Sequence, residues 1–234
     1  MSAGRVDRRT FLRASLQTGV GLVAAGCAAG RTAGTTAPST TRPPAPTDPE
    51  TTTMPSPATT PASAILLASF SRPGENYWYG DRRDLEVGNT EVLATMIADR
   101  LGCDVFRIEA TDPYPHDYRE TVDRNVREQD EDARPVIVGA LPDVSGYSTV
   151  ILASPIWNVR PPMIMSTFVE AIDLTGTTLL PVTTHAMSGL GRAVEVYSAL
   201  APGAIVGEGL AVRGEEVADA GDDVDAYLAR TLRR

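Results

Sequence analysis

The sequence predicts an α/β fold for residues 64–234, a doubly wound five-stranded parallel sheet with helices on both faces. The first observation is a set of short apolar runs without polar alternation, typical of strands that are buried on both faces. The second is that segments with apolar residues at helical spacing separate these runs. Regular alternation of the two patterns indicates parallel strands joined by right-handed helical crossovers.

The expected elements follow this alternation along the chain. Strands are expected at residues 64–70, 104–110, 149–157, 178–184 and 204–212, of which the second has the weakest pattern. Helices are expected over residues 92–101, 164–172, 190–200 and 224–231. Pro161 and Pro162 suit the start of the second of these helices, and Pro202 stops the third.

Residues 117–133 are charged almost throughout. Oppositely charged side chains stand four residues apart, as in Arg124 and Glu128, which favours a solvated helix stabilised by ion pairs. In an alternative interpretation, Tyr114, Pro115 and Tyr118 pack over a binding site.

Residues 1–27 have the pattern of an export signal with a lipobox. Four arginines precede an apolar stretch at residues 14–26, which is shorter than the roughly 20 residues that span a bilayer. The run from Asp7 to Arg13 resembles a twin-arginine signal. The string VAAGC at residues 23–27 resembles a bacterial lipobox, which predicts lipidation of Cys27. The alternative is an ordinary signal peptide with a chance cysteine.

Residues 28–63 are rich in Thr, Pro and Ala, and Met54 is their only large apolar side chain. Such a composition cannot bury enough surface to offset the entropy of ordering, so a disordered tether is expected. Together with the signal, it predicts a lipid-anchored protein on the extracytoplasmic face of the cell membrane.

Composition excludes several classes of function. The chain has no Lys, which excludes a Walker A loop and Schiff-base chemistry. With two Cys and two His, and neither CxxC nor HExxH, a zinc site is not expected. Residues 64–234 carry 15 Arg and 27 acidic residues, a net charge of −12, so nucleic acid is not expected as a partner.

Distinctive residues gather in the loops that leave the first, third and fourth expected strands. In an open parallel sheet, ligands bind at the carboxyl ends of the strands, near the switch in strand order. The sequence therefore predicts a binding site formed by Ser71, Arg72, Gly88, Asn89, Thr90, Glu91, Ser154, Pro155, Ile156, Trp157, Asn158, Thr184, His185, Ser188, Gly189 and Gly191.

The strings in these loops resemble those of flavodoxins. GNTE, PIW, TH and SGLG occur in this order after the expected strands, and RGEE follows at residues 213–216. The resemblance is to the flavodoxin subgroup in which an insertion, here residues 73–87, splits the phosphate loop. It covers essentially all of residues 64–234, and it implies the strand order 2-1-3-4-5 and FMN bound without a covalent bond.

The residues agree with a phosphate site. Free backbone amides from Asn89 to Glu91, at the positive end of a helix, suit a phosphate group. Side chains of Ser71, Asn89 and Thr90 supply further donors, and Arg72 adds positive charge.

Other residues suit the flavin ring. Trp157 is expected either to stack on the isoalloxazine ring or to cap the edge of the core. His185 is interpreted either as a flavin contact that couples proton and electron movement or as a structural histidine. The amides of Ser188 and Gly189 suit the pyrimidine end of the ring, and residues 77–79 either shield the cofactor or mark a partner surface.

The leading hypothesis is a membrane-tethered electron carrier that binds FMN and exchanges electrons with redox partner proteins or small-molecule acceptors. The first alternative is an FMN-dependent NAD(P)H:quinone or nitro oxidoreductase, which no loop motif separates from a carrier. Another is a hydrolase using Ser188 with His185, although the loop lacks GxSxG. The last is a lipoprotein that has lost the cofactor and only binds partners.

Overall fold

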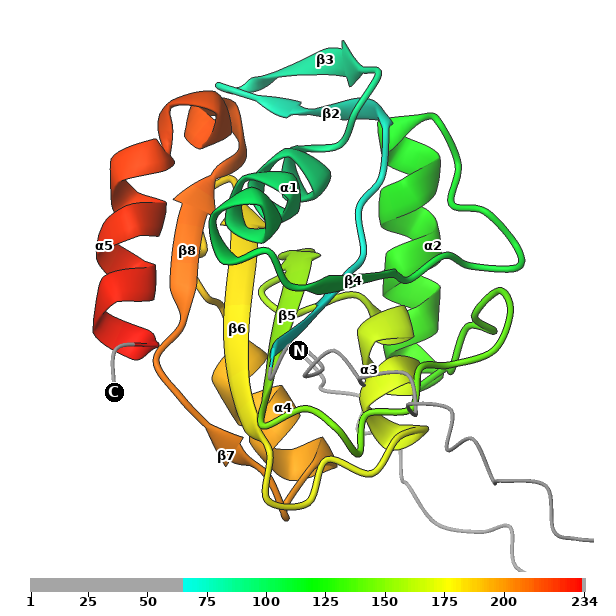
Figure 1. Ribbon diagram of the computed structural model, residues 1–234. Coiled ribbons are helices and arrows are strands. Elements are labelled where there is room, and N and C mark those ends of the chain that lie inside the picture. The colour runs from blue at the N-terminus through cyan, green and yellow to red at the C-terminus, as the bar shows by residue number, and fades with distance from the viewer. Residues whose placement is uncertain (1–64, 233–234) are drawn as a thin grey trace, which may run out of the picture. The chain divides into compact units, whose positions relative to one another are not determined.

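The computed structural model describes residues 65–232 (Figure 1). The predicted signal, Cys27 and the tether lie outside these residues. Within them, no helix combines the length and the apolar composition that crossing a membrane requires.

A mostly parallel sheet forms the centre of the described fold. Its strand order is β4-β1-β5-β6-β7, and β8 also pairs with β6. The strands are β1 (Ile65–Ser69), β4 (Asp104–Arg107), β5 (Thr149–Pro155), β6 (Thr178–His185), β7 (Ile205–Val206) and β8 (Leu210–Arg213). All of these pairs are parallel. The α/β fold and the order 2-1-3-4-5 are therefore confirmed.

The fifth position of the sheet is divided between two short strands. β7 pairs with the start of β6, and β8 pairs with its end. The break at residues 207–209 contains two glycines that lie close to neighbouring side chains. A Cβ atom on Gly207 would lie 2.8 Å from Leu180 Cδ2, and one on Gly209 would lie 2.6 Å from Leu190 Cδ2. The continuous strand expected at residues 204–212 is thus interrupted.

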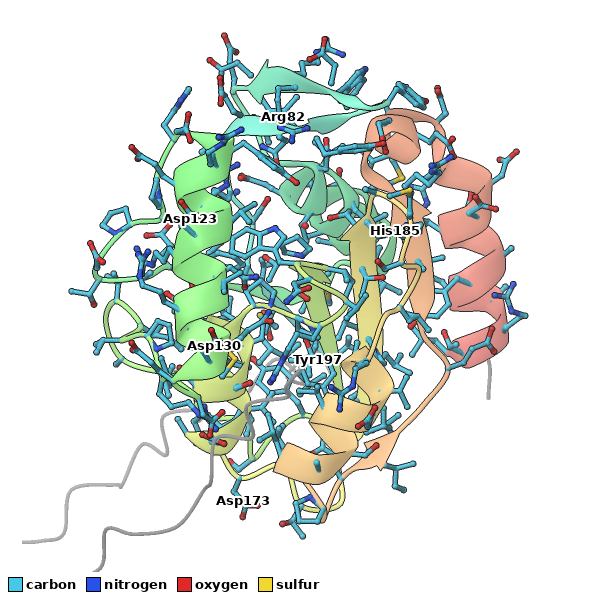
Figure 2. The ribbon with its side chains drawn as sticks, turned by 180° about the vertical axis from the view of Figure 1, so that it is seen from behind. Arg82, Asp123, Asp130, Asp173, His185 and Tyr197 are labelled. Carbon is cyan, nitrogen blue, oxygen red and sulfur yellow. The ribbon has the colours of Figure 1, made fainter. Side chains whose placement is uncertain are left out.

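Helices cover both faces of the sheet. They are α1 (Asn89–Leu101), α2 (Tyr118–Asp130), α3 (Met163–Glu170), α4 (Ala193–Leu200) and α5 (Gly221–Thr231), with a 3₁₀ helix, η1 (Gly214–Asp219). Neighbouring residues of β1 show the alternation that builds two cores. Leu67 belongs to a core with Ile97 of α1 and Tyr227 of α5. Leu66 belongs to another with residues of α3 and α4, among them Tyr197 (Figure 2).

The insertion at residues 73–87 forms an antiparallel hairpin that sequence patterning did not predict. Its strands are β2 (Gly74–Trp78) and β3 (Asp81–Leu85). The turn residues Tyr79 and Gly80 have φ of 47° and 95°, the signs required by a tight turn that follows strand twist. The hairpin lies at the carboxyl end of the sheet, where Arg82 and His185 are also found (Figures 1 and 2).

Helix α2 is less solvated than its charge pattern predicts. Asp117 caps it by accepting a hydrogen bond from the Glu120 amide at 2.8 Å. Arg124 forms the expected ion pair with Glu128 at 2.7 Å, but Glu128 is buried. Tyr118, at the start of α2, lines the pocket described next, whereas Tyr114 and Pro115, which the alternative interpretation grouped with it, do not.

Candidate functional site

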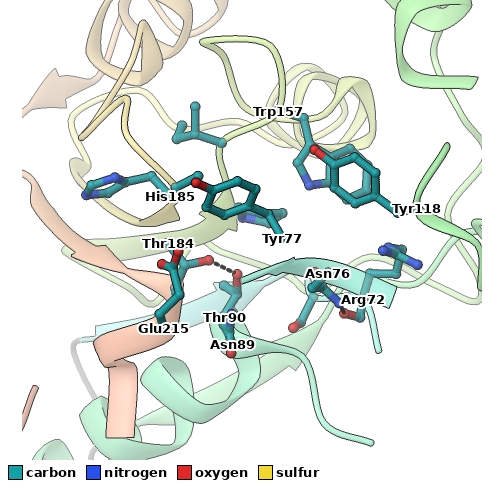
Figure 3. Close-up of a pocket in the computed structure, with 15 residues that line it drawn as sticks. Arg72, Asn76, Tyr77, Asn89, Thr90, Tyr118, Trp157, Thr184, His185 and Glu215 are labelled. Atoms are coloured by element: carbon teal, nitrogen blue, oxygen red, sulfur yellow. Dashed lines mark hydrogen bonds between the residues drawn. The ribbon is translucent and has the colours of Figure 1, made fainter. Parts of the chain in front are cut away.

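A pocket lies at the carboxyl ends of β1, β5 and β6, between α1, the hairpin and η1 (Figure 3). It brings together nine of the residues predicted from the loops: Ser71, Arg72, Asn89, Thr90, Pro155, Ile156, Trp157, Thr184 and His185. The lining also contains Tyr77 and Tyr118, which the sequence offered as covering residues in one of two interpretations. The structure adds four residues that were not predicted: Asn76, Ala186, Gly214 and Glu215.

Seven predicted residues do not line this pocket. Gly88 is the residue before α1, and a Cβ atom there would lie 2.3 Å from Ser71 Oγ, so it acts by permitting close approach. The Glu91 side chain instead pairs with Arg107 at 2.5 Å. Ser154 is fully buried within β5.

The remaining four lie in the turns that flank the pocket. Asn158 donates to Gln129 Oε1 at 2.9 Å rather than toward a ligand. Gly189 and Gly191 have positive φ in the turn after β6, and the Gly191 amide donates to the Ser188 carbonyl at 2.8 Å. These residues shape the loop without facing the pocket.

The N-terminus of α1 presents hydrogen-bond donors to the pocket. Among residues 65–232, the backbone amides of Asn89 and Thr90 have no partner. The Glu91 amide, expected to be free, donates to Ser71 Oγ at 3.0 Å and to the Gly88 carbonyl at 3.0 Å. Two free amides at the positive end of a 13-residue helix suit an anion such as a phosphate group.

Two threonine hydroxyls meet beside these amides. Thr90 Oγ1 lies 2.6 Å from Thr184 Oγ1, at the end of β6, and both residues are buried (Figure 3). One hydrogen bond uses one of the two hydroxyl hydrogens, which leaves the other to donate into the pocket.

Arg72 takes a different part from the one expected. Its guanidinium donates to the carbonyls of Pro115 at 2.7 Å, His116 at 3.0 Å and Glu75. Burial lowers the pKa of Arg72, partly offset by the charge of Glu75. The residue therefore connects the hairpin to the loop before α2, and these contacts occupy both terminal nitrogens.

Aromatic side chains form one side of the pocket. The Trp157 ring meets the rings of Phe70 at 5.6 Å and Tyr114 at 5.2 Å, both edge to face. It caps the core edge and lines the pocket at once. The guanidinium carbon of Arg82 lies 3.7 Å from the centroid of the Tyr118 ring. This cation–π contact attaches the hairpin to α2.

His185 stands at the end of β6. Burial lowers the pKa of its imidazole, and the positive charge of Arg213 lowers it further. Its Nδ1 atom is buried without a hydrogen-bond partner among the described residues. The histidine is thus favoured in its neutral form.

Comparison with known families decides the identity. A sequence model of the family described as Flavodoxin matches residues 86–227. The chain belongs to the flavodoxin family. No curated protein matches it.

Two solved structures share the fold of this chain. A flavoprotein from Bacteroides uniformis is 23% identical, with a TM-score of 0.58 over 72% of this chain and 99% of its own. A flavoprotein from Bacteroides eggerthii is 24% identical, with a TM-score of 0.57 over 73% and 98%. Each alignment includes nearly all of the other structure and about three quarters of this flavodoxin-family chain.

The size of the pocket bears on how a flavin would fit. Its volume is about 100 Å³, whereas pockets for cofactors are on the order of 300–1,000 Å³. Figure 3 shows the Tyr77 ring extending from the hairpin between His185 and Trp157. The donors at α1 suit a phosphate group, and the pocket with Tyr77 in this position is smaller than a typical cofactor site.

Proposed function

We propose that this flavodoxin-family protein binds FMN without a covalent bond and carries electrons between redox partners. The carrying observation is that free α1 amides and the Thr90–Thr184 hydroxyl pair meet aromatic side chains in one pocket. This combination suits a ligand with a phosphate at one end and a flat ring at the other.

Each part of the pocket has a proposed task. The amides of Asn89 and Thr90 hold the phosphate, with the threonine hydroxyls beside them. Trp157 and Tyr118 orient the ring and exclude water from it, and neutral His185 offers a hydrogen bond at its rim. FMN, when bound, would supply reversible uptake of electrons.

The lining favours a carrier over a reductase that uses a nicotinamide cofactor. Among the lining residues Arg72 is the single arginine, and three backbone carbonyls already bind it. A phosphorylated second substrate would meet no arginine in the pocket other than Arg72, whose terminal nitrogens are bound by carbonyls and whose buried Nε alone lacks a partner among the described residues.

The test uses the full chain loaded with FMN. After anaerobic reduction with dithionite, the purified protein should pass electrons rapidly to oxidised cytochrome c. It should oxidise NADPH slowly in the presence of a quinone. Rapid NADPH oxidation would favour the oxidoreductase instead. A protein that shows no flavin absorption after FMN has been added and the unbound FMN removed would refute FMN binding.

We also propose that the protein works at the membrane surface. The twin-arginine signal, a lipid on Cys27 and the tether would hold the flavin domain at the extracytoplasmic face. The twin-arginine export pathway carries folded proteins, so the cofactor could be inserted before export. The mass of the mature protein from its native host should show a diacylglyceryl group at Cys27, and an unmodified thiol there would contradict the proposal.

A further inference from the structure

Glu215 is a buried acid in the pocket to which the proposed function assigns no task. It is 9% exposed and lies on η1, which follows the fifth strand position. Its Oε1 accepts a hydrogen bond from the Tyr79 amide at 3.1 Å, at the turn of the hairpin. Its Oε2 is buried without a partner among residues 65–232.

A carboxylate oxygen that is buried and unpartnered requires a donor. Figure 3 shows the Glu215 side chain directed toward Thr184 and Thr90, into the pocket. A ligand that enters this pocket therefore meets an acceptor here, whereas the α1 terminus offers donors.

The position of Glu215 limits which part of a flavin can reach it. Gly214, the preceding residue, packs against Asn89 at the start of α1, where a Cβ atom would lie 2.5 Å from Asn89 Nδ2. Glu215 is therefore close to the proposed phosphate end of the site. Its negative charge would repel the phosphate itself, so a neutral donor next to the phosphate is the group that fits.

We propose that Glu215 binds a hydroxyl of the ribityl chain through Oε2 while Oε1 holds the Tyr79 amide. Ribityl hydroxyls are the neutral donors adjacent to the phosphate, whereas the ring N–H lies at the far end of the ligand. Glu215 thereby selects flavins that carry the ribityl chain and connects their binding to the hairpin. This inference rests on the proposed flavin site.

The test compares three ligands on the full chain: FMN, riboflavin and lumiflavin, which lacks the ribityl chain. Glu215→Gln should lower the affinity for riboflavin about tenfold, which is the lower end of the loss expected for a hydrogen bond to a charged group. The affinity of the variant for lumiflavin should stay within about twofold of the wild-type affinity. The affinity for FMN should fall less than the affinity for riboflavin, because the variant also removes the repulsion between Glu215 and the phosphate.

Glu216→Gln is the matched control, because this neighbouring side chain is 53% exposed and does not line the pocket. It should leave all three affinities unchanged. Equal weakening of riboflavin and lumiflavin by Glu215→Gln, or no weakening of riboflavin, would overturn the inference while leaving flavin binding in place. A wild-type chain that binds none of the three would instead overturn the proposed function, and this inference with it.

A measurement on the wild-type chain tests the same contact if Glu215→Gln does not fold. Saturating riboflavin should slow hydrogen exchange of the Tyr79 amide, because Glu215 is then fixed by two donors. Saturating lumiflavin should slow it much less. Equal protection by both ligands would overturn the proposal.

Discussion

The hydroxyl of Thr90, at the start of α1, lies 2.6 Å from the hydroxyl of Thr184, at the end of β6. The pair joins the helix that offers amides for a phosphate to the strand that ends at His185. Neither residue is near the other in sequence, so the parallel sheet brings them together.

Thr90→Ala should weaken the binding of FMN more than the binding of riboflavin, because the lost hydroxyl donates to the phosphate and not to the ring. A lost hydrogen bond to a charged group costs about 1.5–3 kcal/mol, or roughly 10- to 150-fold in affinity. Fluorescence titration with both ligands measures this difference. Thr231→Ala, whose hydroxyl donates to the Tyr227 carbonyl in α5, is the control. Equal losses for FMN and riboflavin would show that the phosphate binds elsewhere.

Gly88→Ala should disrupt the loop that supports the site. The backbone at Gly88 has φ −68° and ψ 146°, which alanine adopts freely, so any effect comes from crowding. The new Cβ atom would lie 2.3 Å from Ser71 Oγ and 2.5 Å from the Arg72 carbonyl. We expect a loss of about 1–3 kcal/mol in the free energy of unfolding, measured with denaturant, and weaker FMN binding. Gly146→Ala, with no atom within 4 Å of its Cβ, should show neither effect.

His185 should make stability depend on pH. Burial and then Arg213 lower its pKa below the ordinary 6.5, so just below that pH the unfolded chain binds more protons than the folded one. The free energy of unfolding should therefore decrease as pH falls from about 6.5 to 5. His185→Gln should show a flatter dependence. An unchanged slope in His185→Gln would contradict this assignment.

The acidity of residues 64–234 should lower the midpoint potential of bound FMN. Added electrons bring negative charge into a body of net charge −12, where repulsion opposes them. Salt screens this repulsion, with a Debye length of about 10 Å at 0.1 M and about 3 Å at 1 M. Spectroelectrochemical titration should show the potential rising with ionic strength. A constant potential would mean that contacts such as Trp157 set it.

The central strands β1, β5 and β6 could be predicted because they are buried on both faces and therefore largely apolar, whereas the edge strand β4 is mostly exposed and has a weaker pattern. β5, with Val150 to Ala153 completely buried, is a clear example. The loop residues could be predicted for the same reason, since the carboxyl ends of such strands meet at one edge. Seven of them do not line the pocket, for local reasons: Asn158, with φ 48°, lies in a turn that directs it to Gln129, and Ser154 is buried within β5.

The hairpin and Glu215 could not be predicted from local pattern. The hairpin strands are polar, and contacts distant in sequence hold them, such as Arg72 with the His116 carbonyl and Tyr118 with Arg82. Glu215 is buried next to Gly214, which packs against Asn89, more than a hundred residues earlier in the sequence. The RGEE string marked the segment, but only the fold shows which glutamate enters the pocket.

The most direct test of flavin binding is titration of FMN with the full chain, in which quenching of flavin fluorescence reports binding. We expect saturation at one FMN per chain, with riboflavin bound at least about tenfold more weakly because it lacks the phosphate that the α1 amides hold. An absence of quenching would contradict flavin binding, and equal affinity for the two ligands would contradict the phosphate site at Asn89 and Thr90.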